Sequence, residues 1–240
     1  MIREAIISNL KIWLTDFIHL FFPPRCAACD TILQEEEQCL CTNCLQQIPR
    51  TLLHQQKENP IEYQLRKKFR IRRGTAFFYY KKEKRYDELI HLIKYKGKCS
   101  LGHYLGQLMA DELLPDDFFR NIDLIIPVPL HPKRQRQRGY NQSETIAQGV
   151  SRKTSIPLNT TALIRTKYND TQVHHSYLDR LKNVQDSFQV VRPEEVKEKH
   201  ILLIDDVLTT GATITACIQA LSKVEGIRIS VLTLSAVKRY

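Results

Sequence analysis

The chain has 240 residues, of which 42% are hydrophobic and 26% are charged, a composition that suits one sizeable globular domain with a small additional module. Lysine and arginine outnumber aspartate and glutamate by 36 to 26, so the formal net charge is +10 and a polyanionic partner such as nucleic acid is favoured. No GxxxxGK segment occurs and no GxGxxG follows an apolar strand, which argues against a nucleoside triphosphate P-loop and a dinucleotide-binding fold.

Residues 2–22 predict an amphipathic helix, because apolar residues recur at helical spacing and Pro23-Pro24 ends the pattern. Charged residues interrupt the run, so we expect no membrane span, and no small-residue cleavage site marks a secretory signal. A cytoplasmic chain is therefore expected. The helix is predicted to pack on a neighbouring module or on another subunit, with a position on a membrane surface as the alternative.

Two C-x-x-C pairs follow this helix and are separated by eleven residues. Such a duplicated spacing predicts four thiolates arranged tetrahedrally around one Zn²⁺, and a shell closed by four sulfurs indicates a structural metal rather than a catalytic one. The predicted ligands are Cys26, Cys29, Cys41 and Cys44. We expect Cys39 to be a spare thiol, and a buried cluster of free thiols is the alternative for the whole group.

Residues 50–73 are interpreted as a basic linker between an N-terminal helix and zinc finger, residues 1–49, and a main domain, residues 74–240. Six cations fall within eight positions of this segment: Arg66, Lys67, Lys68, Arg70, Arg72 and Arg73. A charge run of this kind is usually a solvated face, but beside a zinc module in a basic protein it is equally consistent with contact to nucleic acid.

The main domain begins with alternating strand and helix patterns. Residues 75–80 predict a strand, residues 86–95 and 101–114 predict helices, and residues 122–128 predict a second, buried strand. This order favours an α/β fold with a mostly parallel sheet flanked by helices.

A basic loop follows the strand at residues 122–128, at the end where open α/β sheets bind their ligands. Its cations are expected to contact either a pyrophosphate or a nucleic-acid backbone: Lys133, Arg134, Arg136 and Arg138. In the same loop Tyr140 could stack on a base. Asn141 could read a base, or either Asn141 or Ser143 could cap the helix that follows.

Residues 156–164 predict a further strand, and residues 227–237 predict the strand that completes the sheet. Between them lies the polar segment 165–188, whose first half is interpreted as a mobile loop over the site. We expect no chemistry from the neighbouring His174 and His175, because adjacent side chains diverge.

The most informative stretch is 200–213, HILLIDDVLTTGAT. An apolar run predicts a buried strand, two carboxylates follow its end, and a small-residue turn leads into a helix. The turn amides and the positive helix end suit a phosphate, while the carboxylates suit ribose hydroxyls. The candidate ribose-phosphate residues are Asp205, Asp206, Thr209, Thr210, Gly211, Ala212 and Thr213. An ordinary helix N-cap after an acidic turn is the alternative reading.

This stretch resembles the phosphoribosyl-pyrophosphate (PRPP) loop of the type I phosphoribosyltransferases. Together with the segments 22–26, 127–143 and 171–184, it makes the whole chain similar to the ComF family, and specifically to its ComFC type. The resemblance implies a type I phosphoribosyltransferase-like domain with PRPP and Mg²⁺ as ligands, beside a zinc finger. It also implies a role in DNA uptake during natural transformation, with single-stranded DNA and a ComFA-like helicase as partners.

Three functions stay open at this point. The chain could be a competence protein that binds single-stranded DNA and PRPP, a free-standing phosphoribosyltransferase for a nucleobase or another small nitrogen nucleophile, or a PRPP sensor without catalysis. No residue stands out as a general base, so the pattern does not decide whether pentosyl transfer from PRPP occurs. The apolar first helix leaves self-association of the chain open as well.

Overall fold

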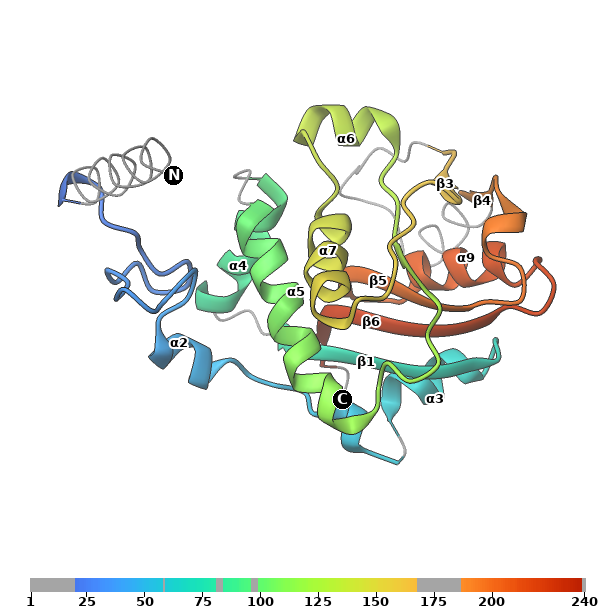
Figure 1. Cartoon of the computed structure of the whole chain (residues 1–240), viewed down its shortest axis with the longest axis horizontal. Coiled ribbons are helices and arrows are strands. Elements are labelled where there is room, and N and C mark those ends of the chain that lie inside the picture. Colours follow the sequence, from blue (N-terminus) through green and yellow to red (C-terminus); the bar gives the residue numbers. More distant parts are fainter. Residues whose placement is uncertain (1–19, 58, 81–83, 96–98, 168–186, 239–240) are drawn as a thin grey trace, which may run out of the picture. The chain divides into compact units, whose positions relative to one another are not determined.

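The computed structural model describes residues 20–57, 59–80, 84–95, 99–167 and 187–238, and the chain divides into two units, Met1–Ile48 and Pro49–Tyr240 (Figure 1). Most of the helix expected at residues 2–22 lies outside the described residues. Among those that are described, no helix has the length and apolar character that crossing a bilayer requires.

The first unit is small and holds the cysteine-rich segment. Arg25 and Ile32 form an antiparallel bridge that brings the two ends of a short turn together, and the helix α2, Thr42–Gln47, closes the unit. The Sγ of Cys41 caps this helix by accepting a hydrogen bond from the amide of Cys44 at 3.5 Å.

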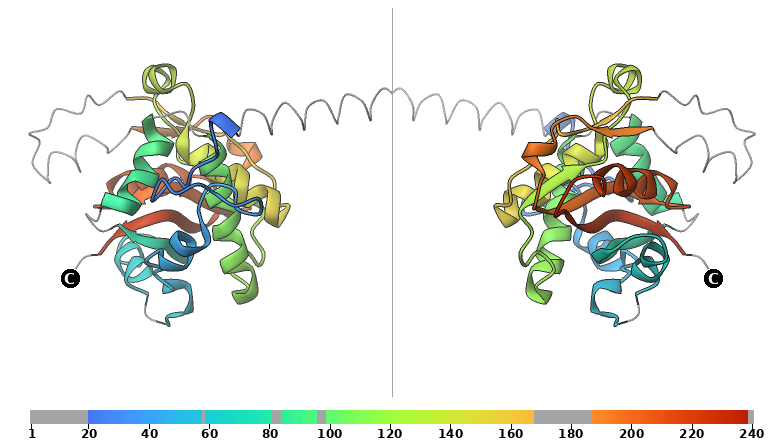
Figure 2. Two further views of the ribbon diagram at one scale, coloured as in Figure 1. Left: turned by 90° about the vertical axis from the view of Figure 1, so that its left-hand side faces the viewer. Right: turned by 90° about the vertical axis from the view of Figure 1, so that its right-hand side faces the viewer.

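The second unit is built on a four-stranded parallel sheet, which confirms the α/β class expected from the sequence. The strand order is β1-β6-β5-β2, with bounds Ile71–Tyr80, Arg228–Val237, His200–Leu208 and Leu124–Pro127. β5 and β6 are buried along almost their whole length, and the apolar run 201–204 of β5 is typical of a strand buried on both faces. Helices cover both faces of the sheet (Figures 1 and 2).

Alternation along β5 divides the interior of this unit into two cores. Leu203 packs in one core with Ile61 of α3 (Pro60–Arg66) and Ile218 of α9 (Ala212–Leu221). Ile204 points to the other face, which is covered by α7 (Gln142–Thr154) and its neighbour α5 (Cys99–Leu113). These two helices pack closely, since a β-carbon on Gly106 or Gly149 would collide with backbone of the other helix.

The segment 50–73 is folded, so its interpretation as a linker is wrong. It forms the 3-10 helix η1 (Leu53–Gln55), then α3, and then enters β1 at Ile71. Asn59 caps α3 by accepting the amide of Ile61 at 2.9 Å, with Pro60 at the first helical position, and Leu65 is buried against the sheet. The high charge masked this helix in the sequence, although the Asn-Pro start and the apolar residues four apart predict one.

The remaining elements lie around the sheet. They are the helices α4 (Lys84–Tyr95) and α6 (Pro132–Arg138) and two short 3-10 helices, η2 (Leu114–Asp116) before β2 and η3 (Pro193–Glu195) before β5. A second sheet pairs β3 (Leu163–Arg165) antiparallel with β4 (Phe188–Val190).

The strand expected at 156–164 is therefore mostly irregular, and only Leu158 bridges to Ile125 before β3 begins. The loop expected in the first half of 165–188 falls mostly within residues 168–186, which, with His174 and His175, lie outside the described residues.

Candidate functional site

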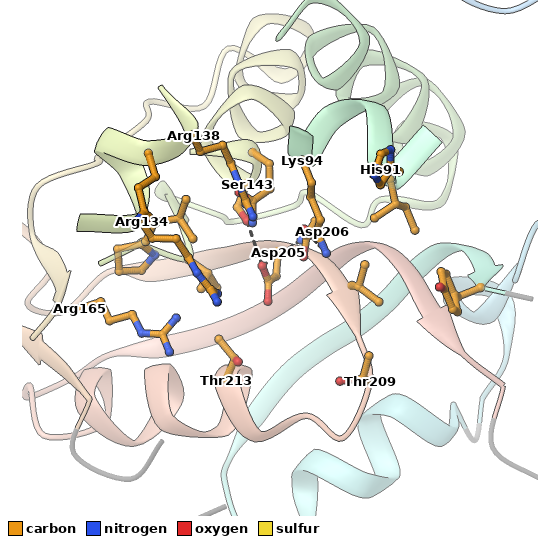
Figure 3. A pocket seen from close by; sticks show the side chains of 18 of the residues that line it. His91, Lys94, Arg134, Arg138, Ser143, Arg165, Asp205, Asp206, Thr209 and Thr213 are labelled. Carbon is orange, nitrogen blue, oxygen red and sulfur yellow. Dashed lines mark hydrogen bonds and ion pairs between the residues drawn. The ribbon is translucent and has the colours of Figure 1, made fainter. Parts of the chain in front are cut away.

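A pocket of about 780 Å³ opens at the carboxyl ends of β2 and β5 (Figure 3). Its wall combines the acidic pair of β5 with cations from three other elements. The polar residues that line it include Lys94, Arg134, Arg138, Ser143, Arg165, Asp205, Asp206, Thr209 and Thr213. The sequence-predicted acidic pair and part of the predicted basic segment therefore meet in one cavity.

The acidic pair lies inside β5 rather than after its end, because the strand continues to Leu208 and Asp205 pairs with Thr233 of β6. Each carboxylate is only 6% exposed. Successive side chains of a strand point in opposite directions, and Figure 3 shows Asp205 directed toward α9 and Asp206 toward α4. The pair thus borders the pocket on two sides.

Asp205 is held by two hydrogen bonds to its Oδ1. The Oγ of Ser143 donates at 2.9 Å from the start of α7, and the amide of Asp206 donates at 2.9 Å. Burial, followed by the neighbouring charge of Asp206, raises the pKa of Asp205 to about 7, an effect that Ser143 and Lys94 partly offset. Asp205 can therefore change its protonation state near neutral pH.

Asp206 is paired with Lys94 of α4, whose Nζ lies 2.9 Å from Oδ2. Sequence analysis did not select Lys94, because a single lysine in an amphipathic helix carries no motif. Only the crossing of α4 over the end of β5 reveals its role as counterion. Ser143 was likewise considered only as a helix cap.

The threonine-rich segment divides into a turn and the first turn of α9. Gly211 adopts φ +78°, the left-handed region that glycine enters without strain, and α9 begins at Ala212. The Oγ1 of Thr210 accepts the amide of Ala212 at 3.3 Å, and Nε2 of Gln64 in α3 donates to the carbonyl of Thr210 at 3.3 Å. Thr209 and Thr213 line the pocket beside the amide-rich end of this helix.

The basic segment after β2 is a helix and not the expected loop. His131 caps α6 by accepting the amide of Lys133 at 3.2 Å, and Gly139 ends the helix at φ +86°. Helical spacing sorts the four predicted cations. Arg134 and Arg138, one turn apart, line the pocket, whereas Lys133 and Arg136 are exposed and are not among its lining residues.

Arg165 of β3 supplies a third guanidinium that sequence analysis missed. It lies over the ring of Phe188 in β4, 5.5 Å from the ring centroid. Burial lowers the pKa of Arg165, and the charge of Arg134 lowers it further. Two guanidinium groups from different elements thus repel each other in the pocket, an arrangement that a bound polyanion would relieve.

The two remaining predicted contact residues, Asn141 and Tyr140, do not line the pocket and instead hold neighbouring helices in place. Asn141 caps α7 by accepting the amide of Ser143 at 3.1 Å and donates to the carbonyl of Val128 at 3.0 Å. Of the two roles left open for Asn141, the structure thus supports the cap. Tyr140 donates its hydroxyl to the carbonyl of Ile93 and so links the end of α6 to α4.

In the first unit, the four predicted cysteines gather at one point. The sulfurs of Cys26, Cys29, Cys41 and Cys44 all lie within 4.8 Å of one another. The Sγ of Cys29 and Cys41 are 3.7 Å apart, close to the roughly 3.8 Å edge of a tetrahedron with Zn–S bonds of about 2.3 Å. Cys39 is not part of the group. The arrangement can hold a metal ion.

The family described as the phosphoribosyl transferase domain matches residues 140–239 of the chain. DNA utilization protein YhgH of Escherichia coli O157:H7 is 32% identical over 136 residues, which cover 55% of this chain and 59% of YhgH. Competence protein F of Haemophilus influenzae is 38% identical over 102 residues, 42% of this chain and 44% of that protein.

Competence protein ComFC of Bacillus subtilis is 30% identical over 103 residues, 43% of this chain and 38% of ComFC. The chain thus spans less than two thirds of the length of each of these relatives. Within the second unit, residues 140–239 are thus similar to a phosphoribosyl transferase domain.

Proposed function

We propose that this chain is a member of the ComF family that binds PRPP in the pocket of its second unit and acts on single-stranded DNA during DNA uptake. The proposal that the chain binds PRPP is supported by one observation above all: an acidic pair, a threonine-lined helix start and three arginines line the same cavity. A volume of about 780 Å³ is of the size that small-molecule sites usually have.

Each part of PRPP has a chemically matched group in this pocket. The ribose hydroxyls would donate to Asp205 and Asp206, as hydroxyl donors do to buried carboxylates. The 5-phosphate would lie at the turn before α9, where Gly211 allows close approach and the first helical amides have no partner within the helix.

The pyrophosphate group would meet the guanidinium groups of Arg134, Arg138 and Arg165, which line the opposite part of the pocket. Mg²⁺ would enter with PRPP, since a hard cation bound by phosphate oxygens also takes carboxylate oxygens. Lys133 and Arg136, which do not line the pocket, have no part in this arrangement.

For the first unit we propose a structural Zn²⁺ bound by the four clustered cysteines. Backbone amides support thiolate charge there, since the amide of Cys41 donates to the Sγ of Cys26 at 3.3 Å. Four sulfurs complete the shell of the metal, so it would stabilise the fold of this unit and would not bind substrate.

The DNA half of the proposal is supported by the relatives and by charge. The relatives' names refer to DNA utilization and to competence, and the chain carries a net charge of +10. Phosphoribosyl transfer to a nitrogen nucleophile is the second candidate, favoured by the three arginines that would stabilise a departing pyrophosphate. Release of pyrophosphate from PRPP in the presence of a nucleobase would establish it.

The test of the PRPP site is calorimetric titration of the full chain with PRPP and Mg²⁺. We expect the double variant Asp205→Asn with Asp206→Asn to lose binding while its circular dichroism stays unchanged, because asparagine keeps the volume but not the charge. Asp111→Asn with Glu225→Gln removes two charges from surface carboxylates outside the pocket and serves as the control. Normal PRPP binding by the pocket variant would refute the assignment.

A further inference from the structure

The exposed side of α3 and the segment between α3 and β1 carry a cationic surface that includes an aromatic ring. We call it the α3 surface and define it by Tyr63, Lys67, Lys68 and Arg70, all exposed. Tyr63 is 66% exposed, and the Nζ of Lys67, one helical turn on, lies 4.4 Å from the centroid of its ring. The ring is therefore exposed to solvent and lies beside a positive charge.

The structure separates the six cations of the basic run into two groups. Arg66 is paired with Glu62 at 2.9 Å and donates to the carbonyl of Arg72 at 2.6 Å. Arg73 turns inward, donating to the carbonyl of Asp116 at 3.1 Å with its guanidinium 4.8 Å from the ring centroid of Phe118. Both side chains stabilise the fold.

Of the other four cations, Arg72 follows Ile71 in β1 and faces away from α3, and its charge acts on His200. In the part of the chain that the structure describes, no carboxylate forms an ion pair with Lys67, Lys68 or Arg70. Holding like charges close together costs free energy, and a polyanion that binds across them would recover it. An exposed tyrosine among them adds a flat face on which a nucleobase can stack.

The α3 surface also adjoins the pocket through one contact. Gln64, next in the chain to Tyr63, donates from Nε2 to the carbonyl of Thr210 at 3.3 Å, and a β-carbon on Gly211 would lie 3.5 Å from the same Nε2. The helix that carries Tyr63 thus also supports the turn at the rim of the pocket. In Figure 3 this helix, in cyan, lies directly below that turn.

We propose that single-stranded nucleic acid binds on the α3 surface, with its phosphates on Lys67, Lys68 and Arg70 and a base stacked on Tyr63. The inference rests on the proposed function for the DNA partner. It deepens that function by assigning the bound DNA to the α3 surface, whereas the α6 arginines that line the pocket are left to PRPP. A single strand fits better than a duplex, because its bases are free to stack on a lone ring while its backbone follows the cations.

The experiment measures binding of a fluorescent oligothymidylate to the full chain by anisotropy over a range of salt concentrations. Tyr63→Ala should weaken binding by about tenfold, the scale of one lost base-aromatic contact, whereas Tyr63→Phe should bind normally. Lys68→Ala with Arg70→Ala should lower the slope of log K against log salt by roughly 1.4, about 0.7 for each phosphate contact.

The matched control is Arg152→Ala with Lys153→Ala, which removes the same charge from α7 on the opposite face of the sheet. Thermal unfolding of each variant shows whether the fold is kept. Tyr63→Phe keeps the aromatic ring and loses only the hydroxyl group, so it tests whether the ring itself is what binding requires. Equal losses in both charge pairs, or unchanged binding in Tyr63→Ala, would overturn the inference and leave only diffuse attraction to polyanions.

Titration with PRPP is run on the same variants and separates this inference from the proposed function. If the α3-surface variants bind both PRPP and oligothymidylate as the wild type does, only the inference about the α3 surface is overturned. A wild-type chain that binds neither ligand would overturn both.

Discussion

The Nζ of Lys94 lies 2.9 Å from the Oδ2 of Asp206, so the helix α4 supplies the counterion for one member of the acidic pair. The other member, Asp205, takes a hydroxyl donor from α7 instead. Two adjacent carboxylates are therefore stabilised by different helices and in different ways. Lys94 also lowers the pKa of Asp205, although burial and Asp206 together raise it to about 7.

The first prediction concerns the pH dependence of PRPP binding. Asp205 accepts hydrogen bonds best when ionised, so affinity for PRPP should fall as the pH drops through about 7. Lys94→Ala removes a charge that lowers the pKa of Asp205, so the midpoint should move to higher pH in this variant. Calorimetry between about pH 5.5 and 8.5 measures the shift.

The phosphates of PRPP titrate in the same range, so Asp205→Asn reports the part of the profile that belongs to the ligand. Lys153→Ala, which removes a lysine paired with Asp111 outside the pocket, should leave the midpoint in place. A midpoint that stays fixed in Lys94→Ala would show that Lys94 does not control the ionisation of Asp205.

The second prediction concerns Gln64, which joins the α3 surface to the pocket turn. We expect PRPP to change the affinity for oligothymidylate, and oligothymidylate to change the affinity for PRPP by the same factor, about 5-fold or more. Gln64→Ala should keep both separate affinities within about twofold and reduce the coupling factor toward one, because only the connecting hydrogen bond is lost. Anisotropy titrations with and without saturating PRPP provide the factor.

Gln64→Glu retains an acceptor but loses the donor to Thr210, so it should behave like Gln64→Ala. Full coupling in both variants would mean that the two ligands communicate by another route, or simply by charge.

The third prediction concerns metal content. Cys41→Ser removes one of four clustered sulfurs and should lower the bound zinc per chain and increase proteolysis of the first unit, because the fold of a small unit depends on its metal. Cys39→Ser, two residues away and outside the cluster, should retain full zinc. Elemental analysis of the purified variants measures the zinc bound per chain. A zinc content equal to that of the wild type in Cys41→Ser would refute the assigned ligands.

The fourth prediction concerns the stability of the second unit at low pH. Burial lowers the pKa of His200, to which the charges of Arg228 and Arg72 add, while Asp123 and the carbonyl of Asn121 oppose the shift. The ring is neutral in the fold: Nδ1 lies 2.8 Å from the carbonyl of Asn121 and Nε2 lies 2.9 Å from the Oγ of Ser230.

The unfolded chain therefore binds a proton at a higher pH than the folded chain does. The stability due to His200 is complete above its ordinary pKa of about 6.5 and decreases below it, by at most about 1.4 kcal/mol per pH unit. Urea unfolding at about pH 7 and pH 5 should show a smaller loss for His200→Gln than for the wild type. Equal losses would mean that another group dominates the acid sensitivity.

The sequence predicted those parts of the site that are continuous in the chain. β5, the acidic pair and the start of α9 follow one another within fourteen residues, and the cysteine pairs have a regular spacing. Lys94 and Arg165 could not be found in this way, since each lies on an element that reaches the pocket only through tertiary packing. Their local sequences resemble those of ordinary surface cations.

Two errors have a physical explanation that sequence patterns can address. Charge density suggested a linker at 50–73, but Asn59 and Pro60 are a helix start and Leu65 is buried. The run after β2 was expected to be a loop, but His131 caps it and Gly139 ends it, both of which are helix signals. In each case the capping residues were more informative than the charges between them.

The opposite orientations of Asp205 and Asp206 depend on the pairing of β5 with β6, in which Asp205 lies beside Thr233. Deleting or inserting one residue between His200 and Ile204 would turn each carboxylate to the opposite face of the strand, so that the two could no longer both keep their present partners, Ser143 and Lys94. A change of length in this part of β5 should therefore disrupt the pocket even where the sheet still forms.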